Sequence, residues 1–329
     1  MYEHQRLRAP QSNDAAESEH GLNLARRVHL AAALVTGPYT VLGFYSPVYI
    51  MQRYYNITMT SQQVKPAAIV LCQVNGCTVL LYAATMCCLS LSSDSKLLMR
   101  SSLANAMMFA LGMLYGTYLI FTEWGSQDWY WAMILAGAFI LLFQLSCYQL
   151  IAMPPALCED IPAQRTSTIK WVQNMYFFLA CALLPSLCFD LFAPSSYLSV
   201  FFPGIKQATP EVSEVAFLYS MLKALVLSSY VLLLVLVSYC EDQDFLRKLS
   251  IGNGVGWLIS FLWAVHYVQS AVGGWIWMPN AALNAGCTTL MFYGAVLLRQ
   301  SKHQQPAFSS NKVEPPIMHY QVVDAIVSY

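Results

Sequence analysis

The chain has 329 residues, and its 17 Lys and Arg balance its 17 Asp and Glu, so the formal net charge is zero. Hydrophobic residues make up 57% of the chain and charged residues only 10%, whereas ordinary soluble domains carry about 25% charged residues. A soluble globule of this length could not cover its surface with so few charges. The composition therefore excludes a soluble enzyme, a disordered chain and a nucleic-acid binder with a basic face, and it indicates a protein embedded in the lipid bilayer.

Eight stretches are long and apolar enough to cross a bilayer, since a spanning helix needs about 20 mostly apolar residues. They lie near 28–51, 67–91, 102–122, 129–153, 171–192, 214–239, 250–272 and 277–298. The expected fold is an all-α, polytopic membrane bundle of eight transmembrane helices, with a polar arm at 1–27 and a tail at 299–329. In the alternative, one stretch is re-entrant or buried, which leaves seven crossings.

The distribution of Lys and Arg predicts the orientation, because these residues concentrate in cytosolic loops. Thirteen of them fall in the arm, the tail and the loops on one side of the predicted helices. Only Arg53, Lys65 and Lys206 fall on the other side, and Lys223 lies inside a span. We therefore expect both ends of the chain to be cytosolic, in the plasma membrane or an endomembrane.

A shift of 148 residues aligns the second half of the chain with the first. The stretch 82–143 then matches 230–291 at eleven of 62 positions without a gap, and the matches include Asp94/Asp242 and Asn105/Asn253. This pattern predicts two four-helix repeats, 28–153 and 171–298, joined by a cytosolic linker at 154–170. Because each repeat has an even number of crossings, the two would lie parallel, as in one class of transporters. The alternative is chance similarity between apolar hairpins.

Polar side chains inside a span are costly, so they are candidates for a functional site. The candidates for ligand binding are Lys223, His266, Asn280 and Asn284 in the outer half of the second repeat, and Asn75, which aligns with Lys223. We expect Lys223 and His266 to face a common interior cavity open to the non-cytosolic side. The acidic residues nearest to Lys223 by topology are Asp190, Glu211 and Glu214.

Each candidate also has a purely structural explanation. The Lys223 side chain could reach toward the headgroups, with its stem over apolar surface. His266 could be a hydrogen-bonded core residue, and the asparagines could join neighbouring helices, as Asn105 and Asn253 are expected to do near the cytosolic ends. The tryptophans near the outer ends of the spans, Trp275 and Trp277 among them, are typical of an aromatic belt at the interface.

Two motifs lie outside the spans. Asn56-Ile57-Thr58 is an acceptor pattern for N-glycosylation, and the charge distribution independently places it on the non-cytosolic side. The tail contains Tyr320-Gln321-Val322-Val323, a pattern that resembles the sorting signals read by adaptor proteins. The sequence has no CxxC, no Cys/His cluster and no glycine-rich phosphate loop, so we expect neither a metal nor another cofactor.

Three functions are compatible with this pattern. The first is a transporter or binder of a small solute or lipid, which the repeats and the polar residues at matched depth favour. The second is a structural or assembly subunit of a membrane complex without transport activity. The third is a membrane-embedded enzyme with His266 as acid/base, which is disfavoured because no carboxylate lies well inside a span. The expected partners are the bilayer and an unidentified small solute or lipid, with no nucleic acid.

The first prediction concerns orientation. Epitope tags at both ends should survive protease added outside sealed cells and should be digested after the membrane is permeabilised. The measurement is immunoblotting of the two tags before and after permeabilisation. Loss of either tag while the membrane is intact would overturn the predicted topology.

Overall fold

The computed structural model describes residues 12–49, 66–121, 137, 140–148, 166–201, 210–269 and 274–304. Nearly all of these residues are helical, and no strand occurs among them. The long helices are α1 (Ser12–Tyr45), α3 (Pro66–Leu89), α4 (Ser95–Phe121), α6 (Ser167–Phe192), α8 (Pro210–Val237), α9 (Gln243–Gln269) and α10 (Met278–Gln304). Two short elements accompany them, α7 (Pro194–Phe201) and the 3-10 helix η4 (Gly274–Trp277).

Seven of the described helices are long and apolar enough to cross a bilayer. They confirm the coarse expectation of a multi-pass, helical membrane protein. The fourth predicted span, 129–153, lies largely outside the described residues, although 140–148 within it are helical. Helices α1 and α10 extend beyond the predicted spans, to Ser12 and Gln304, because a backbone that is already hydrogen-bonded in a helix has no need to unwind at the edge of the apolar stretch.

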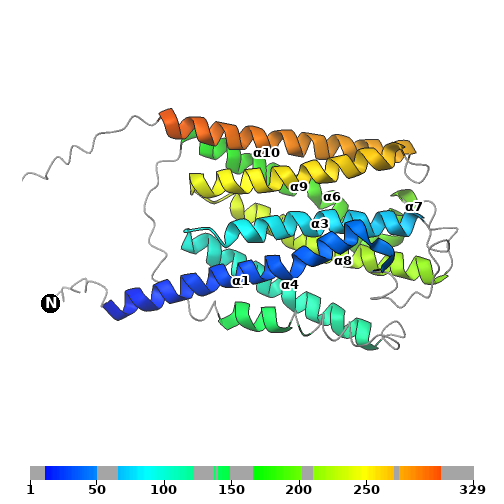
Figure 1. Cartoon of the computed structure of the whole chain (residues 1–329), viewed down its shortest axis with the longest axis horizontal. Helices are drawn as coiled ribbons and strands as arrows, with labels where there is room; N and C mark the ends of the chain where they lie inside the picture. The colour runs from blue at the N-terminus through cyan, green and yellow to red at the C-terminus, as the bar shows by residue number, and fades with distance from the viewer. Residues whose placement is uncertain are drawn as a thin grey trace, which may run out of the picture.

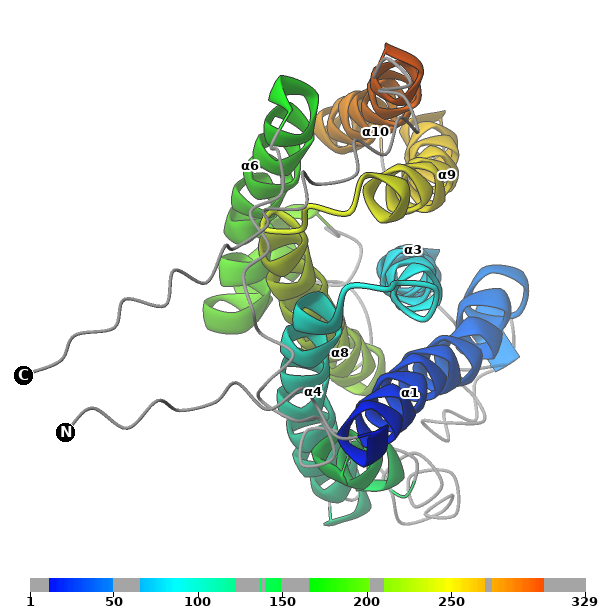
Figure 2. The ribbon, with the colours of Figure 1, turned by 90° about the vertical axis from the view of Figure 1, so that its left-hand side faces the viewer.

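The long helices run side by side along the longest axis of the molecule (Figure 1). Seen end-on, α3 and α8 occupy the centre, with α1 and α4 on one side and α6, α9 and α10 on the other (Figure 2). Helix α3 contacts α1, α8 and α9, while α8 contacts α3, α4 and α6. The two central helices therefore connect the two sides of the bundle.

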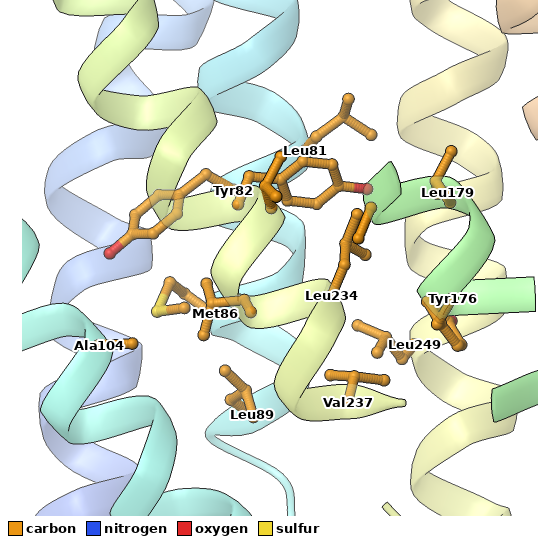
Figure 3. Close-up of a cluster of buried hydrophobic side chains, with 14 of the residues drawn as sticks. Leu81, Tyr82, Met86, Leu89, Ala104, Tyr176, Leu179, Leu234, Val237 and Leu249 are labelled. Carbon is orange, nitrogen blue, oxygen red and sulfur yellow. The ribbon is translucent and has the colours of Figure 1, made fainter. Parts of the chain in front are cut away.

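The hydrophobic core forms around these central helices (Figure 3). It includes Leu81, Tyr82, Met86 and Leu89 of α3, Leu234 and Val237 of α8, Tyr176 and Leu179 of α6, and Leu249 of α9. A glycine permits the close contact between α3 and α9, because a Cβ at Gly256 would lie only 2.7 Å from Cδ2 of Leu81. Small residues of this kind let membrane helices approach closely and gain van der Waals contact.

One end of the bundle carries the start of α1 and of α6, the end of α10, and the α3–α4 and α8–α9 loops (Figure 1). Apart from Lys223, all Lys and Arg of the described residues lie near this end of the bundle, at helix ends or, for the first two, on α1 near the level of the α3–α4 loop: Arg26, Arg27, Lys96, Arg100, Lys170, Arg247, Lys248, Arg299 and Lys302. Arg26 marks the level of the α3–α4 loop on α1, since its Nε donates to the carbonyl of Ser92 at 2.8 Å. We refer to this end of the molecule as the basic end.

The α3–α4 and α8–α9 loops have equivalent hydrogen bonds at positions 148 residues apart. Asp94 and Asp242 each accept a hydrogen bond from the backbone N–H three residues later, at 3.0 Å, and so cap α4 and α9. Ser90 and Ser238 each donate their hydroxyl to the carbonyl three residues earlier, at 2.7 and 2.6 Å. The bounds of α4 and α9 also differ by 148 at both ends.

The two loops also contact each other. Ser93 Oγ donates to Oδ2 of Asp242 at 3.2 Å. The Sγ of Cys240 lies 3.8 Å from Oδ2 of Asp94, within the range of a sulfur hydrogen bond. Each capping carboxylate therefore receives a hydrogen bond from the opposite loop.

Candidate functional site

A buried ion pair joins α6 to α8. The Nζ atom of Lys223, in the middle of α8, lies 2.9 Å from Oδ2 of Asp190, two residues before the end of α6. The two side chains are 6% and 0% exposed. Ser220 lies one turn before Lys223 and donates its hydroxyl to Oδ1 of Asp190 at 3.4 Å. A charge inside a span is tolerated when it is paired, so this contact explains how the bundle accommodates Lys223.

A cavity of about 270 Å³ adjoins Lys223. Residues of α3, α6, α7, α8, α9, η4 and α10 line it. Most of the lining is apolar, and its main polar members are Lys223, Tyr230, Trp257, Asn280 and Asn284. A largely apolar hollow with a few convergent polar groups is the usual form of a small-molecule site.

Aromatic rings form one wall of the cavity. Trp263 and Tyr267 are four residues apart on α9, which places them on the same helix face, and their ring centroids lie 5.7 Å apart in a stacked arrangement. Tyr267 also packs against Trp277 of η4 at 5.7 Å. On its other side, Trp263 stacks on Phe44 of α1 at 5.5 Å. This series of rings holds α1, α9 and η4 together.

Hydrogen bonds within the bundle engage some of the polar groups around the cavity. Tyr267 donates its hydroxyl to Oε1 of Gln73 on α3, and Gln73 in turn donates to the carbonyl of Phe44 at 3.2 Å. Asn284 donates from Nδ2 to the carbonyl of Ser260 at 3.2 Å, which connects α10 to α9. These bonds fix the aromatic wall and the α9–α10 hairpin.

Two further polar groups line the cavity without such a bond. The Tyr230 hydroxyl and the Trp257 indole N–H are buried and approach each other, but neither forms a well-aligned hydrogen bond with the described residues. Their rings lie with centroids 6.5 Å apart. The pair places an O–H and an N–H donor at the cavity wall, where the acceptor oxygen of a ligand can engage them.

Three of the five candidate residues meet at this cavity. Lys223, Asn280 and Asn284 all line it, from α8 and α10. His266 is not among the lining residues: its side chain is exposed and touches Trp263 edge-on at 5.6 Å. It precedes Tyr267 by one residue, and each residue turns the helix by about 100°, so Tyr267 faces inward and His266 does not.

Asn75, which aligns with Lys223 at the 148-residue offset, lies on α3. It is fully buried, and its Nδ2 donates to the Tyr39 hydroxyl of α1 at 3.1 Å. It thus joins α3 to α1 as Lys223 joins α8 to α6, through a neutral pair instead of an ion pair. The structure does not bring it to the cavity.

The structure also bears on the expectations for two asparagines and two tryptophans. Asn253 accepts a hydrogen bond from Thr85 of α3 and Asn105 accepts one from Tyr82, so both connect helices. Trp275 is 81% exposed, but Trp277 is 3% exposed and turned into the cavity, which corrects its assignment to an interfacial belt. The glycosylation pattern at Asn56 and the sorting pattern at Tyr320 lie outside the described residues.

The spacing of residues in α9 already indicates that the aromatic residues of this site share one helix face, although the sequence analysis above did not consider this pattern. Trp257, Ser260, Ala264 and Tyr267 follow one another at intervals of three, four and three residues, which is the spacing of one helix face. All four line the cavity. A helix face that combines two large aromatic rings with the small side chains of Ser and Ala leaves space for a cavity.

Comparison of the chain with family models, with curated proteins and with solved structures finds no match.

The second prediction concerns the ion pair. Lys223→Met leaves the Asp190 carboxylate buried without its partner, so it should lower the free energy of unfolding by about 3–5 kcal/mol. The double variant Lys223→Met/Asp190→Leu removes both charges and should recover most of that loss. The measurement is thermal unfolding of purified protein in detergent.

His266→Ala is the matched control, because it also removes a polar group of the same half. The exposed position of His266 predicts a change within about 0.5 kcal/mol. If Lys223→Met were as stable as His266→Ala, the ion pair would not be the contact on which the α6–α8 packing depends.

Proposed function

We propose that this chain binds a small amphipathic solute in the cavity beside Lys223 and carries it across the membrane. The observation that supports this proposal is the convergence of Lys223, Asn280 and Asn284 on one largely apolar hollow. The volume of about 270 Å³ lies just below the range for ligand pockets, about 300–1,000 Å³. That size favours a small solute over a large lipid.

We also propose that the bundle consists of two parallel repeats. The 148-residue offset relates the hydrogen bonds of the two loops and the bounds of α4 and α9. In the end-on view, α1 lies opposite α6, α3 opposite α8 and α4 opposite α9 across the centre of the bundle (Figure 2). The contact of α3 with α9 has its counterpart in that of α8 with α4. This arrangement supports the transport proposal, because parallel repeats of this kind occur in transporters.

The charge distribution supports an orientation with the basic end in the cytosol. The cavity is built from the middle and outer parts of the helices that line it, such as the start of α10 and the end of α9. In this orientation it belongs to the non-cytosolic half of the bundle. A solute would reach it from outside the cytosol.

A structural subunit remains the second candidate function. The observation that favours it is that Lys223 and Asn284 have partners within the bundle, Asp190 and the Ser260 carbonyl. These contacts would hold the helices together whether or not a solute binds. The enzyme alternative loses support, because His266 lies outside the cavity that holds Lys223.

The third prediction tests transport by filling the cavity. Ala182 of α6 lines the hollow, whereas the preceding residue, Cys181, is exposed. Ala182→Phe should reduce solute uptake at least tenfold, because the added ring occupies the space of the solute. The measurement is uptake by proteoliposomes from a broad panel of radiolabelled organic acids, amines, amides and sugars.

Cys181→Phe is the matched control, since it adds a similar side chain one residue away, on the exposed side of α6. It should leave uptake within about twofold of the unmodified protein. If no solute of the panel is taken up, the transport proposal fails and the structural role stands. If both variants take up solute like the unmodified protein, the solute does not pass through this cavity.

The fourth prediction tests the repeat. An experimental structure of residues 122–153 should show a single 3-10 turn near 126–129 and a helix from about 130, at the positions that η4 and α10 occupy 148 residues later. This helix should pack against α4 as α10 packs against α9. A re-entrant or interfacial segment in its place would refute the second repeat unit.

A further inference from the structure

We propose that the solute of this cavity is a small organic anion of the monocarboxylate class, and that it binds together with one proton. This inference rests on the proposed function of the cavity and specifies its ligand. It follows from the kind of polar groups that line the hollow and from the charge that the ion pair leaves there.

The lining offers hydrogen-bond donors to a ligand. Lys223 contributes an ammonium group, Trp257 an indole N–H that can only donate, and Tyr230 a hydroxyl. The Trp257 and Tyr230 groups have no well-aligned partner among the described residues. Asn280 adds a side-chain amide. Such a set fits a ligand whose polar end is an oxygen acceptor.

The positive charge in the cavity lining also favours an anionic ligand. Among the described residues, Lys223 is the only Lys, Arg, Asp or Glu that lines the cavity. Asp190 contacts its ammonium group but is not part of the lining. A ligand in the cavity therefore meets the positive member of the ion pair first, so a carboxylate is attracted where an amine is repelled. The ammonium has three donors and can serve a ligand as well as Asp190.

The uptake of one proton with the ligand follows from a count of the charges at the ion pair and on the ligand. Lys223 and Asp190 together are neutral, so a bound anion would leave one uncompensated negative charge in a region of low dielectric, which is costly. One proton taken up with each anion removes that cost. The proton then resides on one of the two carboxyl groups, Asp190 or the ligand, and Lys223 pairs with the other. No covalent bond is made or broken.

The other titratable groups around the cavity do not offer an alternative at neutral pH. They are Cys77 from α3, Tyr230 from α8 and Tyr267 from α9, all of which are neutral there. The lining residues of α6, α7, η4 and α10 include no titratable group. Among these surrounding groups, Asp190 is the one that can accept a proton from an incoming acid.

The apolar lining of the cavity indicates which group the carboxylate of the ligand is attached to. Leu81, Leu227 and the aromatic wall surround the space beside Lys223, so a short alkyl or aryl group attached to the carboxylate would be buried there. Hexanoate is a suitable probe. Hexanamide has the same shape without the charge, and hexylammonium has the opposite charge.

The fifth prediction is tested by calorimetric titration of the full chain in lipid nanodiscs, with empty nanodiscs as the blank. Hexanoate should bind with uptake of one proton, seen as a difference in heat between phosphate and Tris buffers. Its Kd should rise about tenfold per pH unit between pH 6 and 8, since each bound proton contributes that factor. Hexanamide should bind with no proton uptake and with a Kd independent of pH.

The double variant Lys223→Gln/Asp190→Asn keeps the shape of the ion pair without its charges. It should bind hexanamide within about twofold of the unmodified protein and lose hexanoate binding at least tenfold. Because the proton count is measured on the unmodified protein, it decides the question even if this variant does not fold.

Each remaining outcome contradicts the inference. Hexanoate binding without proton uptake refutes the coupling. Binding of hexylammonium or hexanamide but not hexanoate refutes the ligand class, yet leaves the proposed binding function intact. If none of the three probes binds, the monocarboxylate class is excluded, and the uptake panel separately decides whether the cavity carries another solute.

Discussion

The hydrocarbon interior of a bilayer supplies no hydrogen-bond partner and little screening of charge, so every polar group there must be paired within the protein. The helices satisfy this constraint for the backbone. For side chains the bundle satisfies it in different ways: an ion pair between Lys223 and Asp190, a neutral pair between Asn75 and Tyr39, and asparagines that connect helices. Some buried atoms still lack a well-aligned hydrogen bond with the described residues, among them the Tyr230 hydroxyl and the Trp257 indole N–H at the cavity and Oδ1 of Asn75 away from it.

Composition and hydropathy were sufficient for the multi-pass helical architecture, because long apolar segments permit few other structures. They were less informative about helix ends, since α1 continues through its polar residues as far as Ser12. Depth along a helix could be estimated from the sequence, and Lys223, Asn280 and Asn284 do lie together at the cavity. Direction around the helix was harder to infer: His266 has a suitable depth, but its side chain points away from Lys223.

The partner of Lys223 and the aromatic wall show why the rest of the site was not predictable. Asp190 was one of three acidic residues near Lys223 in the topology, and nothing in a linear pattern ranks them. The choice depends on how α6 and α8 pack, which also places Ser220 beside the carboxylate. Trp277 looked like an interfacial residue by position, yet the α9–α10 hairpin turns its ring inward onto Tyr267.

The exchanged hydrogen bonds between the α3–α4 and α8–α9 loops have a mechanical consequence. Ser93 and Cys240 each reach the capping carboxylate of the opposite loop, so the two sides of the bundle are held at the basic end. These two loops would be the fixed point of a rotation of one side of the bundle against the other. The displacement of the rotating side would grow with distance from the loops and would be greatest at the far end of the bundle, close to the cavity beside Lys223.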